Sequence, residues 1–275
     1  MTRYDLHSHS LASDGALTPD ALIARAIAQG VDVLALTDHD GTEGIIAAQQ
    51  ASKNTELTLI AGVEISVTWA GSTVHILGLN IDIDNVILQQ GLMRMRTYRI
   101  GRAQKMAERL EKSGISGALE GARKYSSDVM LGRLHFAQFL VEHGHAKNIS
   151  DVFKRFLVKN KPGYVSGDWA SLIDAVTWIT AAGGQAVIAH PARYKMTATK
   201  LRRLIIEFKE AGGVGFEVVS GRQHPEEVKK LAQLAEQFGL FSSCGSDFHT
   251  PDNNWVELGN LAEFPKNCIP IWSTW

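Results

Sequence analysis

Asp5-Leu6-His7-Ser8-His9 (DLHSH), followed by Asp14, is the stretch of sequence that decides the fold we expect for this chain. In an extended strand, side chains at positions i and i+2 point to the same face, so His7 and His9 can bind one metal ion or flank two. A His-x-His pair alone also fits a surface strand that carries two histidines. The pair is therefore informative only if similar residues recur at the ends of other strands.

Residues of metal-binding type do recur along the chain, each time at the C-terminal end of an apolar, β-branched run. The recurrences are Thr37-Asp38-His39-Asp40, Gly62-Val63-Glu64, His75, Ala189-His190-Pro191 and Ser246-Asp247-Phe248-His249. In a closed barrel of parallel strands, all the carboxyl ends share one rim. We therefore expect these side chains to meet at one mouth of a barrel.

The remaining pattern fits an α/β fold, because buried strands alternate with amphipathic helices. Val31–Thr37 (VDVLALT) is almost continuously apolar, which is typical of a strand that is buried on both faces of a parallel sheet. Seven strands are predicted, around Tyr4–His9, Val31–Thr37, Leu57–Val67, Thr73–Leu79, Gln185–Ala189, Val214–Val219 and Leu240–Gly245. Helices are predicted near Pro19–Gln29, Thr42–Ser52, Ala170–Ala182, Ala198–Ala211 and Pro225–Phe238.

The segment from 84 to 161 breaks this alternation, since it contains only helical patterns interrupted by glycines. Between Arg94 and Leu134 it carries ten Lys and Arg residues against four Asp and Glu residues. We therefore predict a barrel domain formed by residues 1–83 and 162–275, and an inserted basic helical subdomain formed by residues 84–161 that binds substrate.

The overall composition limits the possible partners. The chain is 45% hydrophobic and 21% charged, with a formal net charge of −1, so it is not a polyelectrolyte binder as a whole. Two cysteines, Cys244 and Cys268, cannot form a disulfide framework and indicate a reducing compartment. No apolar run approaches the roughly 18 residues of a membrane span, and no signal segment is visible. We expect a cytoplasmic protein with no membrane partner and no obligate protein partner.

Imidazole and carboxylate ligands together suit Mn, Fe or Zn, whereas an all-oxygen set suits Mg or Ca. The candidate ligands are His7, His9, Asp14, His39, Glu64, His75, His190, Asp247 and His249. They are too numerous for one ion, and with one carboxylate bridging they imply two or three. Such a cluster lowers the pKa of a bound water and clamps the oxygens of a phosphoryl group in transfer.

Taken together, His7-x-His9, Asp14, Thr37-Asp38-His39, Glu64, His75, His190-Pro191 and Gly245-Ser246-Asp247-Phe248-His249 resemble the motifs of the PHP (polymerase and histidinol phosphatase) family of metal-dependent phosphoesterases. The resemblance covers the whole chain and implies a distorted (β/α)7 barrel with a trinuclear site. We expect two or three divalent ions, with manganese as the first choice and iron or zinc as alternatives. The resemblance implies one ion held by His7, His9, Glu64 and Asp247, a second by Asp14, His39 and His249, and a third by Glu64, His75 and His190. The catalytic group would be a metal-bound hydroxide held by His7, His9, Asp14, His39, Glu64, Asp247 and His249.

Three further motifs resemble the bacterial subgroup of 3',5'-nucleotide bisphosphate phosphatases and 5'-to-3' exoribonucleases of the RNase AM type. They are Arg133-x-His135-Phe136-Ala137, Lys161-Pro162-Gly163-Tyr164 and Ala189-His190-Pro191-Ala192-Arg193-Tyr194. This resemblance implies a nucleotide or short 5'-phosphorylated RNA as substrate. Guanidinium groups match phosphate oxygens, so the expected substrate-binding residues are Arg99, Arg102, Arg133, His135 and Arg193, with Asp20 as a contact to a hydroxyl group.

Several alternatives stay open at this point. Asp5, Asp38 or Asp40 could orient the ligating imidazoles, or could serve only as turn and capping residues. A histidinol-phosphate phosphatase would share the metal ligands, but it would not need the basic insert. A non-catalytic metal-binding PHP module is the alternative from another functional class. The sequence does not decide the native metal, the preferred oligonucleotide length, the physiological RNA or the oligomeric state.

Overall fold

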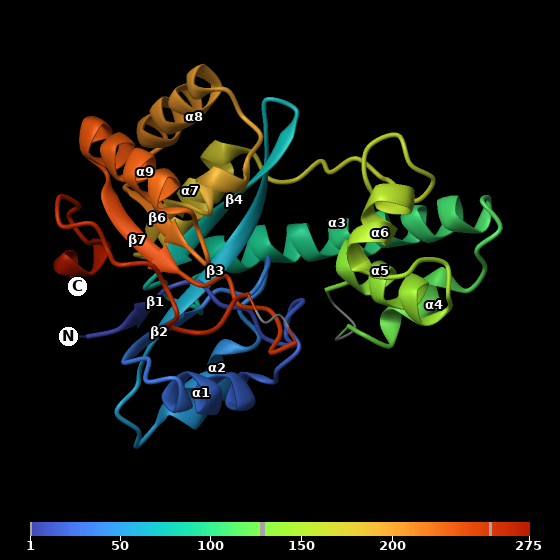
Figure 1. Cartoon of the computed structure of the whole chain (residues 1–275), viewed down its shortest axis with the longest axis horizontal. Coiled ribbons are helices and arrows are strands. Elements are labelled where there is room, and N and C mark those ends of the chain that lie inside the picture. The colour runs from blue at the N-terminus through green and yellow to red at the C-terminus, as the bar shows by residue number, and fades with distance from the viewer. Residues whose placement is uncertain (1, 127–129, 253–254) are drawn as a thin grey trace.

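A computed structural model describes residues 2–126, 130–252 and 255–275. It has a mixed α/β fold in which seven strands form a nearly closed barrel, with a helical insertion projecting to one side (Figure 1). The strands are β1 (Tyr4–Asp5), β2 (Val33–Leu36), β3 (Thr58–Trp69), β4 (Ser72–Leu79), β5 (Gln185–Ile188), β6 (Gly215–Ser220) and β7 (Phe241–Gly245). The order of the strands around the barrel is the same as their order in the sequence. The predicted seven-stranded α/β barrel is confirmed.

The barrel is closed between its first and last strands by single contacts rather than by a full ladder. Leu6 N–H donates to the Cys244 carbonyl over 2.9 Å, and His9 N–H donates to the Phe248 carbonyl over 2.9 Å. Because β1 has only two residues, this closure relies on the segment that follows it. The segment carrying His7 and His9 is therefore held directly beside the segment carrying Asp247.

One strand departs from the predicted parallel arrangement. β4 is antiparallel to both β3 and β5, while the other neighbouring strands are parallel. The cause is a two-residue hairpin loop, Ala70-Gly71, in which both residues adopt positive φ. The expectation that His75 lies at the C-terminal end of its strand was wrong, since it lies in the first half of β4. The reversal of β4 nevertheless carries His75 to the rim where the parallel strands end.

Helices cover the outside of the barrel. They are α1 (Pro19–Ala28), α2 (Ile45–Ser52), α7 (Leu172–Ala181), α8 (Ala198–Glu210) and α9 (Pro225–Phe238). In β2, Leu34 and Leu36 pack outward against α1 and α2, whereas Val33 and Ala35 belong to the barrel interior. Both faces of this strand are buried, which explains its almost continuous apolar sequence.

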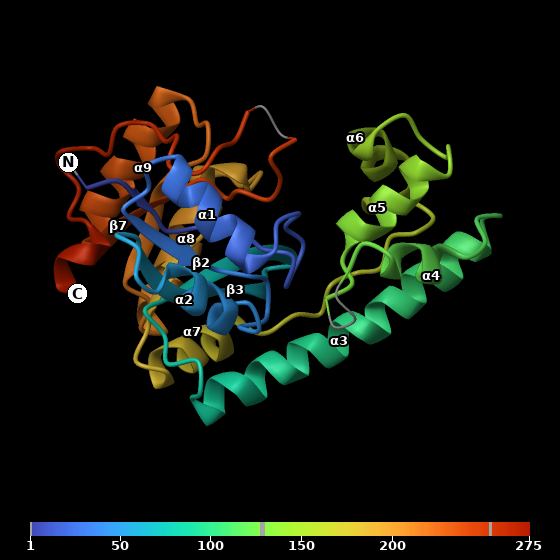
Figure 2. The ribbon, with the colours of Figure 1, turned by 90° about the horizontal axis from the view of Figure 1, so that it is seen from below.

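The insertion is built on a long helix, α3 (Val86–Glu111), which extends from the barrel to the outlying helices (Figure 2). These are α4 (Ala118–Arg123), α5 (Arg133–Glu142) and α6 (Ile149–Val152), which is followed by a π-helical turn at Phe153–Leu157. Leu88, Leu92 and Met95 of α3 pack in the core of the barrel, whereas Ala103, Met106 and Leu110 pack in a separate core. The insertion therefore has its own hydrophobic core and is joined to the barrel through α3, which contributes to both cores.

Gly91→Ala is expected to destabilise the protein by about 1–3 kcal/mol, although alanine normally favours a helix. A Cβ at Gly91 would lie 2.3 Å from the Trp178 ring, where α3 crosses α7. Gly101→Ala in the same helix is the matched control, because a Cβ there meets nothing within 4 Å. It should stabilise the protein by about 0.5–1 kcal/mol. Urea unfolding of both variants would measure the two opposite signs; equal effects would contradict close packing at this crossing.

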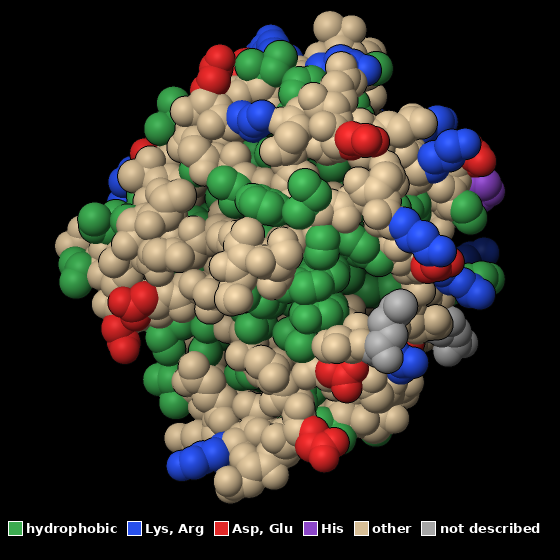
Figure 3. Space-filling view, turned by 90° about the vertical axis from the view of Figure 1, so that its left-hand side faces the viewer, with side chains coloured by type: hydrophobic (Ala, Val, Ile, Leu, Met, Phe, Trp, Pro, Cys, Tyr) green, Lys and Arg blue, Asp and Glu red, His purple; other side chains and the backbone are tan. Residues whose placement is uncertain are grey.

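The face on the side of both termini is seen directly in the space-filling view (Figure 3). It shows a central patch of hydrophobic side chains with few charges (Figure 3). Near the termini, the Tyr4 and Trp272 rings are stacked with centroids 4.1 Å apart, which ties the C-terminal segment to the base of the barrel. Within the described residues, no helix is long and apolar enough to cross a membrane.

Candidate metal centre

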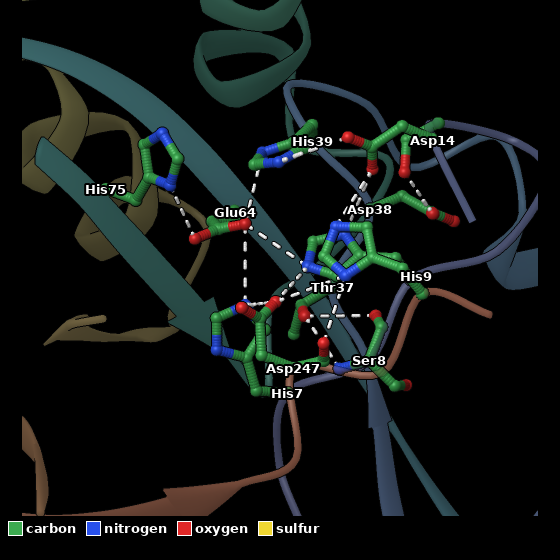
Figure 4. Close-up of polar contacts among 12 residues, drawn as sticks. His7, Ser8, His9, Asp14, Thr37, Asp38, His39, Glu64, His75 and Asp247 are labelled. Atoms are coloured by element: carbon green, nitrogen blue, oxygen red, sulfur yellow. Dashed lines mark hydrogen bonds and ion pairs between the residues drawn. The ribbon is translucent and has the colours of Figure 1, made fainter. Parts of the chain in front are cut away.

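The candidate ligands of the metal centre come from strands around most of the barrel and meet at one rim (Figure 4). His7 and His9 follow β1, His39 follows β2, and His190 follows β5. Glu64 and His75 lie within β3 and β4, and Asp247 and His249 follow β7. His190 and Asp247 adopt positive φ values of 29° and 55°, a strained conformation for residues with a Cβ. Strain of this kind concentrates at functional sites.

The first group of ligand atoms comprises His7, His9, Glu64 and Asp247, and all four residues are buried. The Nε2 atoms of His7 and His9 lie 3.4 and 3.3 Å from Glu64 Oε2, and 3.3 and 3.0 Å from Asp247 Oδ1. Ligands bound at about 2.1 Å in a tetrahedral or octahedral site lie about 3.0–3.4 Å apart. The four atoms therefore have the spacing of a set that surrounds one small cation.

A second group forms around Asp14 and comprises His9, Asp14, His39 and His249. Asp14 Oδ1 lies 3.3 Å from His249 Nε2, and Asp14 Oδ2 lies 3.8 Å from His39 Nε2. His9 Nδ1 lies 3.9 Å from Asp14 Oδ1. The sequence assigned three of these residues to one ion, and the structure brings them together with His9 beside them.

The third group shares Glu64 with the first. Glu64 Oε1 lies 2.9 Å from His75 Nδ1 and 3.0 Å from His190 Nε2, and these two nitrogen atoms are 3.2 Å apart. His39 Nδ1 lies 3.1 Å from the other oxygen, Oε2. The two oxygens of Glu64 thus face different groups of imidazoles, which is the geometry of a bridging carboxylate.

The unsatisfied atoms in this region are the strongest indication that a cation fits. Buried polar atoms are normally hydrogen-bonded. Among the described residues, those buried without a hydrogen-bond partner include His7 Nε2, His9 Nδ1, Asp14 Oδ1, His39 Nδ1, Glu64 Oε2 and His190 Nδ1. Most of these atoms face the groups described above, and divalent cations would satisfy them.

The electrostatics of the rim agree with this interpretation. Burial alone would raise the pKa of Glu64, but the imidazoles of His39, His75 and His7 hold it well below its usual range. The pKa of Asp247 is also well below its usual range. Burial would raise it, but the nearby imidazoles of His7 and His249 lower it by more. Both carboxylates are therefore ionised at neutral pH, as metal ligands must be.

Glu217, on β6, is a functional residue that sequence reasoning missed. It is completely buried, its Oε1 accepts a hydrogen bond from His7 Nδ1 over 3.0 Å, and its Oε2 accepts from the backbone N–H of His190. Ligating histidines commonly donate their second N–H to a carboxylate, which fixes the tautomer and the ring orientation. A carboxylate in the middle of an apolar strand was the signal that could have identified it.

Asp5, Asp38 and Asp40 accept hydrogen bonds from backbone, serine and arginine groups rather than from the ligating imidazoles, which favours the second of the two alternatives left open by the sequence. Asp5 accepts from the backbone N–H groups of Ser246 and Gly259, and burial raises its pKa to about 6. Asp38 accepts from Ser10 and Ser13 in the loop after β1. Asp40 pairs with Arg99 over 2.7 Å and accepts from Ser66 N–H.

A cavity of about 160 Å³, the arginine cavity, opens beside the metal rim. It is lined by Asp14, His39 and His75 on one side and by Arg99, Arg102 and Arg133 on the other. The Arg99 and Arg102 guanidinium groups lie over the Trp169 ring, at 4.9 and 5.2 Å from its centroid. Burial, with Arg133 and Arg99 nearby, lowers the pKa of Arg102 to about 10. The group remains protonated at neutral pH, so the cavity attracts anions.

His135 lines a second and larger cavity of about 680 Å³, the α5 cavity, instead of the arginine cavity. Its Nδ1 accepts from Gly132 N–H over 3.0 Å, which in the neutral ring leaves the proton on Nε2. Asp14 and His249 also line this cavity. The structure therefore separates His135 from Arg133, although the two are close in sequence.

Arg193 and Asp20, the two remaining residues expected to contact substrate, do not lie in the same place. The Arg193 guanidinium pairs with Asp247 while about half of its side chain remains exposed. Asp20 lies exposed in the first turn of α1 and interacts with the Thr18 side chain, and it lines neither cavity. Arg193 is thus part of the metal rim, whereas the structure does not bring Asp20 to the site.

A protein-family model described as PHP domain matches residues 5–218. The chain belongs to the PHP domain family. The resemblance to this family found in the sequence is thereby confirmed.

Characterised relatives of this PHP protein align over nearly the whole chain. One is a 3',5'-nucleoside bisphosphate phosphatase from Chromobacterium violaceum, 46% identical, with 99% of this chain and 96% of the relative covered. Another is the 5'-3' exoribonuclease Rnm from Escherichia coli, 46% identical, with 99% and 93% covered. A solved structure of an amidohydrolase from Chromobacterium violaceum, with bound sulfate and no metal, has a TM-score of 0.95 at 46% identity. The alignment with that structure covers 99% of this chain and 95% of the chain in the solved structure.

Proposed function

We propose that this protein is a metal-dependent phosphoesterase that hydrolyses nucleotide phosphoesters. Its substrates would be the 3'-phosphate of nucleoside 3',5'-bisphosphates and the 5'-terminal linkage of short 5'-phosphorylated RNA. The observation that carries the proposal is the arginine cavity, which opens directly onto the rim of histidines and carboxylates. Relatives named as a bisphosphate phosphatase and a 5'-3' exoribonuclease support it.

For the cofactor, we propose two or three divalent ions, with manganese preferred and iron or zinc as substitutes. The first would be held by His7, His9, Glu64 and Asp247, the second by Asp14, His39 and His249, and the third by Glu64, His75 and His190. Such ions, when bound, offset charge on a phosphoryl group and make water a competent nucleophile at neutral pH.

The protein's own residues would position the substrate. Arg99, Arg102 and Arg133 would bind the 5'-phosphate, and Asp40 would hold Arg99 in place through their ion pair. This places the 3'-phosphate at the rim, since the two phosphates belong to one nucleotide. Cys244 is not a candidate nucleophile, because it is buried and burial raises its pKa. Hydrolysis would then proceed in line, without a covalent enzyme intermediate.

The insertion at residues 84–161 would serve as the substrate-binding subdomain, because α3 and α5 supply the three arginines. The protein would act in the cytoplasm, a location that fits its two free cysteines.

A parallel assay separates this function from the two alternatives. Manganese-loaded protein would be tested on adenosine 3',5'-bisphosphate, 5'-phosphorylated short RNA and histidinol phosphate. We expect turnover of the first two. Phosphate release from histidinol phosphate alone would identify a histidinol-phosphate phosphatase. No turnover of any substrate would indicate a non-catalytic metal-binding module.

Arg133→Ala is expected to raise KM for nucleoside bisphosphate by about 10–100-fold, because it removes a charged partner of phosphate. The variant should retain the full complement of metal, since Arg133 is not a candidate ligand. Arg94→Ala is the control: Arg94 lies exposed over Trp178 and lines neither cavity, so its loss should leave the kinetics unchanged. Steady-state kinetics with metal analysis would check both. Unchanged KM for Arg133→Ala would refute the assigned role.

A further inference from the structure

We infer that the α5 cavity binds the nucleotide on the 3' side of the scissile phosphate in an RNA substrate. This inference rests on the proposed function and extends it from mononucleotides to RNA. The α5 cavity is separate from the arginine cavity but adjoins it, since Asp14 and Leu134 line both. A substrate that extends past the metal rim can therefore enter it.

The two cavities meet at Asp14 and Leu134 and extend from there along different parts of the barrel mouth. The arginine cavity is lined by Ser66, Thr73 and His75 of the β3–β4 hairpin. The α5 cavity is lined by residues 14–16 after β1 and residues 249–252 after β7. In a ring of seven strands that closes between β1 and β7, the β3–β4 hairpin lies across from that closure. Candidate ligands therefore line both cavities: Asp14, His39 and His75 line the arginine cavity, and Asp14 and His249 line the α5 cavity.

The 5'-to-3' direction of an RNA chain then determines which part of the substrate each cavity would hold. With the 5'-phosphate in the arginine cavity and the next phosphate at the rim, the chain continues toward the adjoining α5 cavity. Water attacks phosphorus, the bond to O3' breaks, and O3' departs with the 5'-terminal nucleotide and a proton from the water. The phosphoryl group stays on O5' of the next nucleotide, which becomes the new 5'-phosphorylated end. A nucleoside 3',5'-bisphosphate carries nothing at that O5' position and so would not reach the α5 cavity.

The size and lining of the α5 cavity suit a nucleotide. Its volume of about 680 Å³ lies within the roughly 300–1,000 Å³ typical of small-molecule sites, whereas the arginine cavity, at about 160 Å³, suits a single phosphate. Leu11, Leu134 and Ile149 supply apolar surface for a base. Gln138 lines the same cavity, and its Oε1 is buried without a hydrogen-bond partner among the described residues. Lys124 supplies a positive charge for a backbone phosphate.

Two variants test the assignment. Lys124→Glu reverses an exposed charge in the cavity, and Gln138→Leu removes its amide while keeping a similar volume. Lys112→Glu is the matched control, because Lys112 is also an exposed lysine at a helix C-cap but lines neither cavity. Turnover would be measured on adenosine 3',5'-bisphosphate and on a 5'-phosphorylated trinucleotide. Binding of the trinucleotide to metal-free protein would be measured by fluorescence anisotropy at several salt concentrations.

We expect Lys124→Glu and Gln138→Leu each to weaken trinucleotide binding and raise its KM by at least about tenfold. Lys124→Glu should also lower the slope of log affinity against log salt by about one. Bisphosphate turnover should be unchanged in both variants, and Lys112→Glu should match the wild type throughout. An equal loss on both substrates, or no loss on the trinucleotide, would overturn the assignment. If the wild type turned over neither substrate, the proposed function would fail, while the binding measurements would still decide whether the cavity takes RNA.

Discussion

Glu64→Gln is expected to lower phosphoester hydrolysis by at least about a thousandfold, the largest effect of any single substitution in this protein. The two oxygens of Glu64 face His7, His9 and His39 on one side and His75 and His190 on the other. An amide has one oxygen and one NH₂ group, so it cannot serve both sides. The bound metal content should therefore fall together with the activity, and both would be measured on the same preparation.

The control for this variant is Glu56→Gln, which makes the same change at an exposed position before β3. It should leave activity and metal content unaltered. Retention of wild-type metal content by Glu64→Gln would contradict the bridging geometry, even if the activity were lost.

Glu217→Gln is expected to weaken metal binding by about 10–100-fold, although Glu217 is not a candidate ligand. Its carboxylate accepts hydrogen bonds both from His7 Nδ1 and from the backbone of His190. A glutamine can accept only one of these, because its NH₂ group would face the other donor. The His7 ring would then lose its fixed orientation, or the segment carrying His190 would shift.

Metal affinity would be measured by competition with a chromophoric chelator, and thermal unfolding of the chelated protein would show whether the variant is folded. A positioning role predicts weaker metal binding in a folded protein, together with restoration of activity at high manganese concentration. A fall in stability with unchanged metal affinity would show that Glu217 serves only the barrel core.

The sequence predicted the barrel, and most of the candidate ligands could be singled out because they lie just beyond the end of a buried strand. A residue at the C-terminal end of a parallel barrel strand lies at the rim regardless of how the loops and helices between the strands are arranged. His75 is the informative exception. Its strand runs in the opposite direction, and the Ala70-Gly71 loop that reverses it has no strong hairpin signature. His75 reaches the rim because the hairpin pairs it with Ser66, two residues beyond Glu64 in β3.

The environment of the site could not be predicted, since it depends on contacts between distant segments. Asp40 and Arg99 are far apart in sequence, and only the packing of α3 across the rim makes them an ion pair. His135 was grouped with Arg133 because both belong to one motif, yet positions i and i+2 of a helix face different sides, and the two side chains line different cavities. Glu217 belongs to no motif; its place in the middle of an apolar strand marks it as unusual, and its two partners show what its carboxylate does.

Anomalous X-ray scattering at the manganese absorption edge, from crystals grown with Mn²⁺, tests the central claim most directly. The account predicts two or three peaks at the barrel rim. Glu64 would lie at bonding distance, about 2.0–2.2 Å, from more than one of them. The absence of peaks at the rim, or a single peak that does not touch Glu64, would contradict it.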